Sequence, residues 1–225
     1  MNWQQILDKF YLQAQDSSEL SSVEALDLLN DIYWDVQDDR AWEWLKTTYT
    51  GTTSTTVPYI SLPTDFKYLV PNYNWVGTSF TNLWVPVGYS SNPLPTNIWN
   101  ITVVFRGTNR NVYQVIPFSE KDNYYNINNY CYIDLVNSRL YFTVQPTLAE
   151  SVTYTYIKVA PDVTVSTSPI FRAGFHNIIA YWMAANFNVL QMTDKAQSYR
   201  MENLQLYNDT LLNMQMEDAH QKLWI

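Results

Sequence analysis

The sequence has few of the residues on which enzymes and metal sites depend. Cys131 is its one cysteine, so an intrachain disulfide is excluded and folding in a reducing compartment, the cytoplasm, is expected. Its two histidines, His176 and His220, leave little material for general acid–base chemistry. No glycine lies in a G-x-S-x-G setting, which excludes the nucleophile elbow of the α/β-hydrolases. We therefore expect no catalytic, cofactor or metal site.

Basic residues are scarce as well. The chain has 13 Lys and Arg against 21 Asp and Glu, and residues 1–50 alone hold ten acidic and three basic side chains. A nucleic-acid-binding protein clusters basic residues to neutralise phosphates, so sequence-specific DNA recognition is not expected. No run approaches the roughly 20 apolar residues of a membrane span, and the N-terminus lacks a basic region before an apolar core. We expect a soluble chain without a signal peptide.

Proline is missing from both ends of the chain. All ten prolines lie between Pro58 and Pro169, and since proline interrupts helix interiors, long helices are expected in the two terminal regions. The middle holds runs rich in β-branched and aromatic residues, such as "WNITVVFRG", "YCYIDLVNSRLYFTV" and "SVTYTYIKV", which predict strands. The expected fold is therefore α+β: a helical bundle formed by the N- and C-terminal segments, with an inserted antiparallel β domain. The expected parts are residues 1–50, 51–168 and 169–225, with linkers at 47–56 and 160–169.

Helical periodicity and caps locate the helices in the terminal regions. Ser21 and Glu24 form the sequence of a capping box at the start of the second helix. Ser168 and Pro169 predict an N-cap and a first helical residue for the third helix, and a final helix is expected from Thr193. On the second helix an apolar stripe of Val23, Leu26, Leu29, Ile32, Tyr33 and Val36 lies opposite Asp27, Asp31 and Asp35. The three aspartates recur at four-residue steps, which predicts a solvated acidic face.

The remaining candidates for chemistry have simpler structural interpretations. His176 lies on an apolar helical pattern, and Cys131 in "YCYID" is expected to be a small buried hydrophobic residue. A pair of catalytic carboxylates would have to come from Glu120, Asp122 or Asp134, and nothing in the sequence selects a pair. An enzyme is therefore not expected.

Carbohydrate binding is the alternative that the sequence leaves open. Five aromatic residues lie in a loop-rich part of the β region, where their rings could stack on sugars or fill a core that is poor in Leu and Ile. They are Tyr73, Trp75, Trp84, Tyr89 and Trp99. No spacing distinguishes these two roles, so an aromatic-rich carbohydrate-binding β module remains the second hypothesis.

The order of motifs resembles that of the head-to-tail adaptor, connector or neck, proteins of tailed bacteriophages. The chain runs from "LLNDIYWDVQDDRAWEWL" through a Thr-rich spacer to "YISLPTDF", then to "YIDLVNSRLYFTVQP", "YTYIKVAPD" and "PIFRAGFHNIIAYWMAANF". The resemblance implies a virion protein of the head–tail interface that assembles in the host cytoplasm. It also implies a homo-oligomeric ring, commonly dodecameric, that binds beneath the portal protein and offers a docking surface to a tail, stopper or nozzle protein. DNA would pass through the ring without specific binding during ejection, and no membrane is involved.

The same resemblance suggests roles for three groups of residues. Asp27, Asp31 and Asp35 would face the DNA channel, where an acidic lining repels the DNA backbone and lets it slide. The segment 217–225 would be a portal-binding arm, with an apolar tip that must either find cover on a partner or pack back on the bundle. The residues assigned to this arm are Lys222, Leu223, Trp224 and Ile225. A hinge between the two domains is expected at Tyr59, Leu62, Pro63 and Phe66.

Overall fold

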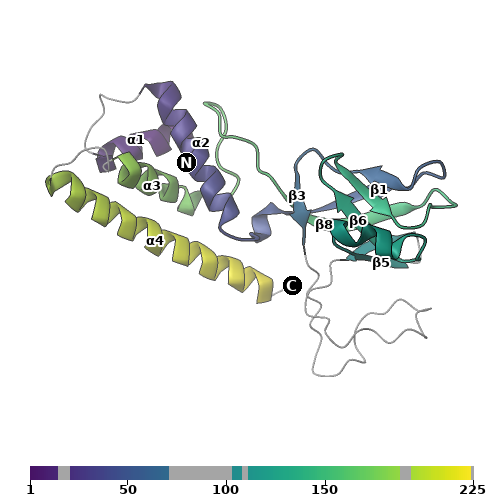
Figure 1. The fold of residues 1–225 in the computed structure, drawn as a ribbon. Helices are drawn as coiled ribbons and strands as arrows, with labels where there is room; N and C mark the ends of the chain where they lie inside the picture. The colour runs from purple at the N-terminus through teal and green to yellow at the C-terminus, as the bar shows by residue number, and fades with distance from the viewer. Residues whose placement is uncertain (15–20, 71–102, 108–110, 188–193, 224–225) are drawn as a thin grey trace. The chain divides into compact units, whose positions relative to one another are not determined.

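The chain divides into two compact units (Figure 1). The computed structural model describes residues 1–14, 21–70, 103–107, 111–187 and 194–223. The helical unit comprises Met1–Leu45 and Ala160–Ile225, and the β unit comprises Lys46–Val159. The predicted α+β class is confirmed, since helices lie at both ends of the chain and strands between them. The junctions lie at 45/46 and 159/160 and not at the predicted 50/51 and 168/169.

The helical unit is built around its most apolar helix. Its helices are α1 (Trp3–Ala14), α2 (Ser22–Asp38), α3 (Asn177–Phe187) and α4 (Asp194–Leu223), with short 3-10 turns η1 (Glu43–Leu45) and η4 (Ala173–Phe175). Helix α3 contacts the other three, and its buried residues lie on all sides, as expected of a central helix. Trp182 of α3 stacks on Tyr207 of α4 with ring centroids 4.5 Å apart, and Phe187 meets Phe10 of α1 edge-on.

Helix α2 begins as the sequence predicts. The side chain of Ser21 accepts a hydrogen bond from the Glu24 backbone N–H, and the Glu24 carboxylate accepts one from the Ser21 N–H at 2.9 Å, which completes the capping box. The predicted apolar stripe is wrong at Val23, whose side chain is 67% exposed while Ile32 is buried. The predicted stripe runs from Val23 to Ile32 in three steps of three residues. Because a helix has 3.6 residues per turn, each such step falls short of a full turn, and three of them bring Ile32 to the side opposite Val23.

The segment from Ala160 to His176 is neither a linker nor the start of a helix. It runs along α2 and is held there by side chains of that helix: Ala160 N donates to Gln37 Oε1 at 2.8 Å, and Ile170 N donates to Tyr33 Oη at 3.1 Å. The helix predicted from Ser168 begins only at Asn177. These side chains of α2 satisfy backbone groups that a helix would have paired internally, so the extended path is stabilised from outside the segment.

The β unit is a curved sheet with one buried face. Its strands are β1 (Lys46–Thr52), β2 (Tyr59–Ser61), β3 (Phe66–Leu69), β4 (Val103–Arg106), β5 (Asn111–Val115), β6 (Tyr130–Asp134), β7 (Arg139–Phe142) and β8 (Ser151–Lys158). Their order is β1-β8-β4-β5-β6-β7-β2, and β3 also pairs with β8. All these pairs are antiparallel except β5–β6, which a 3-10 segment, η3 (Phe118–Tyr124), connects as a parallel pair. The sheet is therefore mixed.

Strand β1 replaces most of the predicted Thr-rich linker. It pairs with β8 along its full length, from Lys46 opposite Ile157 to Thr52 opposite Ser151. Threonine is a good strand residue, so a run that looked like a spacer has the composition of a strand once a partner is available.

The core of the β unit is aromatic. Tyr154 and Tyr156 of β8 are buried, and Phe66 packs against both rings. Cys131 is also fully buried within this core, and burial raises the pKa of its thiol well above the usual range. A thiol held neutral in this way is an unreactive core group, which confirms the structural interpretation of Cys131.

Candidate interaction surfaces

The outer face of α2 is acidic and solvated. Asp27, Asp31 and Asp35 are all exposed, on the side opposite the buried residues of the helix. Trp34 lies between the last two and is 47% exposed, and its indole N–H donates to Asp162 Oδ1 at 2.8 Å. The three predicted aspartates thus share one face, which is available to a partner or to a channel.

At the C-terminal end of α2, the acidic face comes near α4. The pKa of Tyr207 is raised by burial first and then by the negative charges of Asp39 and Asp35. Asp39 also accepts a hydrogen bond from Gln215 Nε2 at 3.0 Å. The hydrogen bond joins the C-cap residue of α2 to α4, so the C-terminal end of the aspartate row lies near α4.

The predicted hinge residues belong to the β unit. Tyr59 lies in β2 opposite Tyr141, Leu62 is buried in the β core, and Pro63 precedes the turn into β3. Phe66 is the first residue of β3 and lies opposite Lys158 in β8. Phe66 thus lies next to the end of the β unit, since the Val159 N–H donates to the Asp65 carbonyl at 2.7 Å. The stretch belongs to the sheet, and its role as a hinge stays a prediction.

The first residues of the predicted C-terminal arm are bonded to other parts of the helical unit. Asp218 is buried, and its Oδ1 accepts a hydrogen bond from the Glu43 backbone N–H at 2.7 Å. Glu217 Oε2 lies 2.6 Å from Arg172 Nη1. An arm that could move would therefore begin after Asp218. Lys222 and Leu223 end α4, and Trp224 and Ile225 lie outside the described residues.

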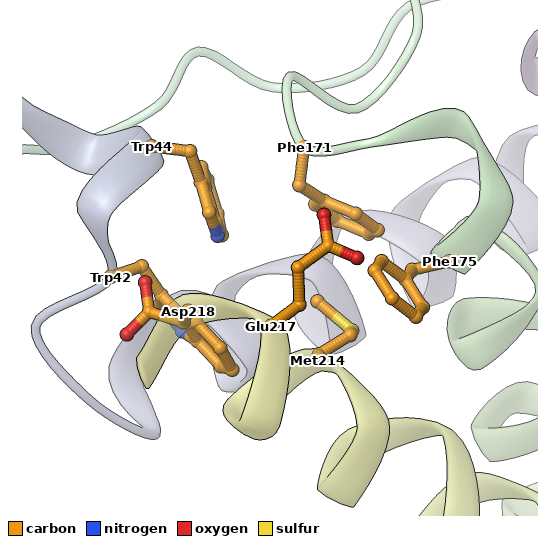
Figure 2. A pocket seen from close by; sticks show the side chains of 7 residues that line it. All are labelled: Trp42, Trp44, Phe171, Phe175, Met214, Glu217 and Asp218. Carbon is orange, nitrogen blue, oxygen red and sulfur yellow. The ribbon is translucent and has the colours of Figure 1, made fainter. Parts of the chain in front are cut away.

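A small aromatic hollow adjoins these two carboxylates. Trp42 and Trp44 stack at 6.1 Å, and Figure 2 shows the Trp44 nitrogen pointing toward the hollow. The lining residues are Trp42, Trp44, Phe171, Phe175, Met214, Glu217 and Asp218. The free space is about 30 Å³, which holds a water molecule, whereas sites for small organic ligands measure about 300 Å³ or more. The hollow is therefore not a substrate or cofactor pocket.

Two of the titratable candidates have structural contacts. The imidazole of His176 is buried, with Nε2 2.8 Å from the Phe171 carbonyl and Nδ1 2.8 Å from the Met1 carbonyl, so its contacts are structural. Asp134 accepts a hydrogen bond from the Asn137 side chain, which lowers the pKa of this carboxyl and keeps it ionised. A general acid needs the opposite shift. Among the described residues, no three His, Cys, Asp or Glu side chains lie together in a way that would hold a metal ion.

The aromatic residues suggested for sugar binding, Tyr73, Trp75, Trp84, Tyr89 and Trp99, lie outside the described residues. The described sheet has its own aromatic row, in which Tyr132, Tyr141 and Tyr59 lie opposite one another on β6, β7 and β2. Tyr132 and Tyr141 stack at 5.3 Å with ring planes only 8° apart. Ring faces that cover each other offer no flat platform for a sugar, so the row does not support the carbohydrate hypothesis.

Two exposed apolar features were not predicted from the sequence. The first is the tip of the β6–β7 hairpin, where Leu135 is 65% and Val136 94% exposed. The second is a stripe on α4. It comprises Met201, Gln205, Asn208, Leu212, Met216 and Ala219, all exposed. Spacings of three and four residues could have revealed the stripe, but the mixture of polar and apolar residues hid it.

The chain matches the model of a known protein family. The model of a family described as SU10 adaptor protein matches residues 1–222 of the chain. A search of curated proteins finds no match. None of the helices in the described ranges has a stretch long and apolar enough to span a membrane.

Proposed function

The chain belongs to the SU10 adaptor protein family, since the family model covers residues 1–222, and we propose that it forms the head-to-tail adaptor ring below the portal of a tailed phage. Family membership supports a structural role in the virion and interactions with other head and tail proteins. The finer proposal is a homo-oligomeric, dodecameric ring without enzymatic activity. The observation that carries it is the match along nearly the whole chain.

The acidic face of α2 supports a role in lining the DNA channel. Asp27, Asp31 and Asp35 lie exposed on one side of a helix that is packed on its other side, so the face is rigid. In a ring this row would be repeated around the channel. Carboxylates repel DNA phosphates, so the genome would pass during ejection without being held.

The end of α4 supports the portal contact. Asp218 and Glu217 anchor the helix to η1 and to Arg172, so a segment that is free to reach a partner would begin after this anchor. Lys222, Leu223, Trp224 and Ile225 would then form a short arm that reaches the portal protein. The opposite face of the ring would receive a tail, stopper or nozzle protein.

The direct test is assembly with the portal. The purified chain is mixed with purified portal protein, and the products are analysed by size-exclusion chromatography with light scattering and by negative-stain electron microscopy. We expect a ring of adaptor chains bound to one end of the portal. A chain that remains a monomer both alone and with the portal would contradict the proposal, as would reproducible turnover of a glycan that depends on Glu120, Asp122 or Asp134.

A further inference from the structure

The hairpin tip is a rigid apolar knob. We use hairpin knob for Leu135 and Val136, the first two residues of the turn between β6 and β7. The turn is fixed by Asn137, whose backbone and side-chain N–H groups donate to the Asp134 carboxylate at 3.2 and 2.7 Å. Turn tips are usually polar, and a preorganised apolar tip binds with little loss of conformational entropy.

The turn is also held from the neighbouring strand. Leu62 N donates to the Ser138 carbonyl at 2.9 Å, and Ser138 adopts a left-handed conformation with φ of 51°. The turn that carries the hairpin knob is therefore held by hydrogen bonds to Asp134 and to Leu62. Its two apolar side chains remain exposed although the polar groups around them are paired.

Helix α4 has an uncharged outer stripe opposite its buried side. We use α4 stripe for Met201, Gln205, Asn208, Leu212, Met216 and Ala219. Met201, Leu212 and Met216 are 64%, 56% and 54% exposed, whereas Asn203 and Met214 on the other side are buried. Scattered exposed hydrophobic residues are normal, but here they align over about 27 Å of helix without a charge between them. Methionine side chains adapt to irregular partners.

The two features lie on units of opposite charge. The helical unit contains sixteen acidic and six basic residues, a net charge of −10, and the β unit contains five acidic and seven basic residues, a net charge of +2. Two helical units, each with a net charge of −10, repel each other. A helical unit and a β unit attract, so the electrostatics favour contact between unlike units.

We propose that the hairpin knob of one copy docks on the α4 stripe of a second copy. This proposal rests on the ring proposed above and specifies its contact between neighbours. Each copy carries both surfaces, so the contact is head-to-tail, and such contacts close into rings when the rotation permits. Glu202 and Asp209, exposed beside the stripe, would form the polar rim that surrounds an apolar contact.

Single substitutions test each surface. Val136→Asp and Leu212→Asp each place a charge at the centre of one surface, and we expect association to weaken at least about 30-fold in each case. Both side chains are exposed, so circular dichroism and the melting temperature should remain those of the wild type. The matched controls are Leu148→Asp, at an exposed apolar position of the β unit, and Asn213→Asp, on α4 but off the stripe. Both controls should assemble normally.

Mixing the two defective variants gives the decisive result. Val136→Asp keeps an intact α4 stripe, and Leu212→Asp keeps an intact hairpin knob. The knob of a Leu212→Asp chain can therefore dock on the stripe of a Val136→Asp chain, and no second contact can form. We expect an equimolar mixture to form dimers that do not grow into rings, while each variant alone stays monomeric, measured by sedimentation velocity with and without the portal.

The outcomes separate this contact from the ring itself. Wild-type rings together with normal rings of either Asp variant would overturn the knob–stripe contact and leave the adaptor ring standing. A mixture that stays monomeric although the wild type forms rings would also overturn it. A wild type that never assembles, even with the portal, would overturn both proposals.

Discussion

Asn30 and Val163 exchange two hydrogen bonds although 133 residues separate them in the sequence: Asn30 Nδ2 donates to the Val163 carbonyl at 3.1 Å, and Val163 N donates to Asn30 Oδ1 at 2.8 Å. The Asn30 amide thus pairs with both backbone groups of Val163, as a neighbouring strand would. Because both backbone groups of Val163 are satisfied by one side chain, the path of residues 160–176 along α2 depends on it.

We expect Asn30→Ala to destabilise the helical unit by about 1–3 kcal/mol, because it leaves two partly buried backbone groups without partners. Urea unfolding measures the loss, and limited proteolysis should reveal new cleavage within residues 160–176. Asp31→Ala, at an exposed position of the same helix, controls for helix propensity. The hypothesis fails if Asn30→Ala loses no more stability than this control.

Features that depend on neighbours in the sequence were predictable. The capping box of Ser21 and Glu24 involves residues three apart, so the local sequence contains all of it. The buried residues of α1 likewise recur at helical spacing; they are Trp3, Ile6, Leu7, Phe10 and Ala14. Local rules suffice where local spacing determines which side is covered.

Features that depend on distant partners were not predictable. Strand β1 is defined by pairing with β8 about a hundred residues later, and a Thr-rich run has the same composition whether or not that partner exists. The late start of α3 depends on Tyr33 and Gln37 of α2, which accept the hydrogen bonds of the preceding segment. The candidate surfaces divide in the same way: the aspartate row of α2 follows from spacing, but the exposure of Val136 follows from the whole sheet.

Alkaline pH should destabilise the helical unit through Tyr33. Burial raises the pKa of Tyr33 to about 12, whereas an unfolded tyrosine ionises near pH 10. Between these values the unfolded chain binds fewer protons than the folded one, so stability falls as pH rises and is fully present below about pH 10. The difference of two pKa units corresponds to about 3 kcal/mol.

Urea unfolding between pH 8 and pH 11.5 measures this slope, and absorbance of tyrosinate at unfolding reports the ionisation. Tyr33→Phe should reduce the slope, and it should cost about 1 kcal/mol at neutral pH because Ile170 N–H loses its acceptor. Tyr125→Phe, at a 74% exposed position, should leave the slope unchanged. Equal slopes for the wild type and Tyr33→Phe would rule out Tyr33 as the source.

Cys131 should not react with thiol reagents in the native protein. Its side chain is fully buried, so a reagent cannot reach the sulfur, and its raised pKa keeps the thiol from ionising to the reactive thiolate. The rate of labelling by an aromatic disulfide reagent should therefore follow the opening of the β unit and increase steeply with urea. Rapid labelling in native buffer, compared with a small free thiol as the reference, would show that this part of the core opens readily.

The acidic face of α2 should prevent the ring from holding DNA. Replacing Asp27, Asp31 and Asp35 with Lys reverses the charge of the face and creates a row of phosphate ligands in each subunit. We expect the variant ring to bind duplex DNA with strong salt dependence, whereas the wild type does not bind, as measured by fluorescence anisotropy between 50 and 200 mM salt. The control carries the same change of charge at exposed positions away from this face: Asp8, Glu120 and Asp122 to Lys. Equal DNA binding by both variants would argue that the α2 face does not line the channel.

Trp224 should anchor the chain to the portal. It lies beyond the described residues, after a helix that Asp218 fixes to the backbone of Glu43. An apolar tip that follows a mostly polar helix needs cover, and a buried aromatic anchor contributes on the order of 2 kcal/mol or more, about 30-fold in affinity. Trp224→Ala should therefore weaken portal binding by this factor, measured by biolayer interferometry, and leave the melting temperature of the free chain unchanged. Leu12→Ala, at a 68% exposed position of α1, is the control for shortening an exposed apolar side chain outside the arm. If Trp224 instead packs back on the bundle, the substitution lowers the melting temperature and leaves portal binding intact, and the arm is then excluded.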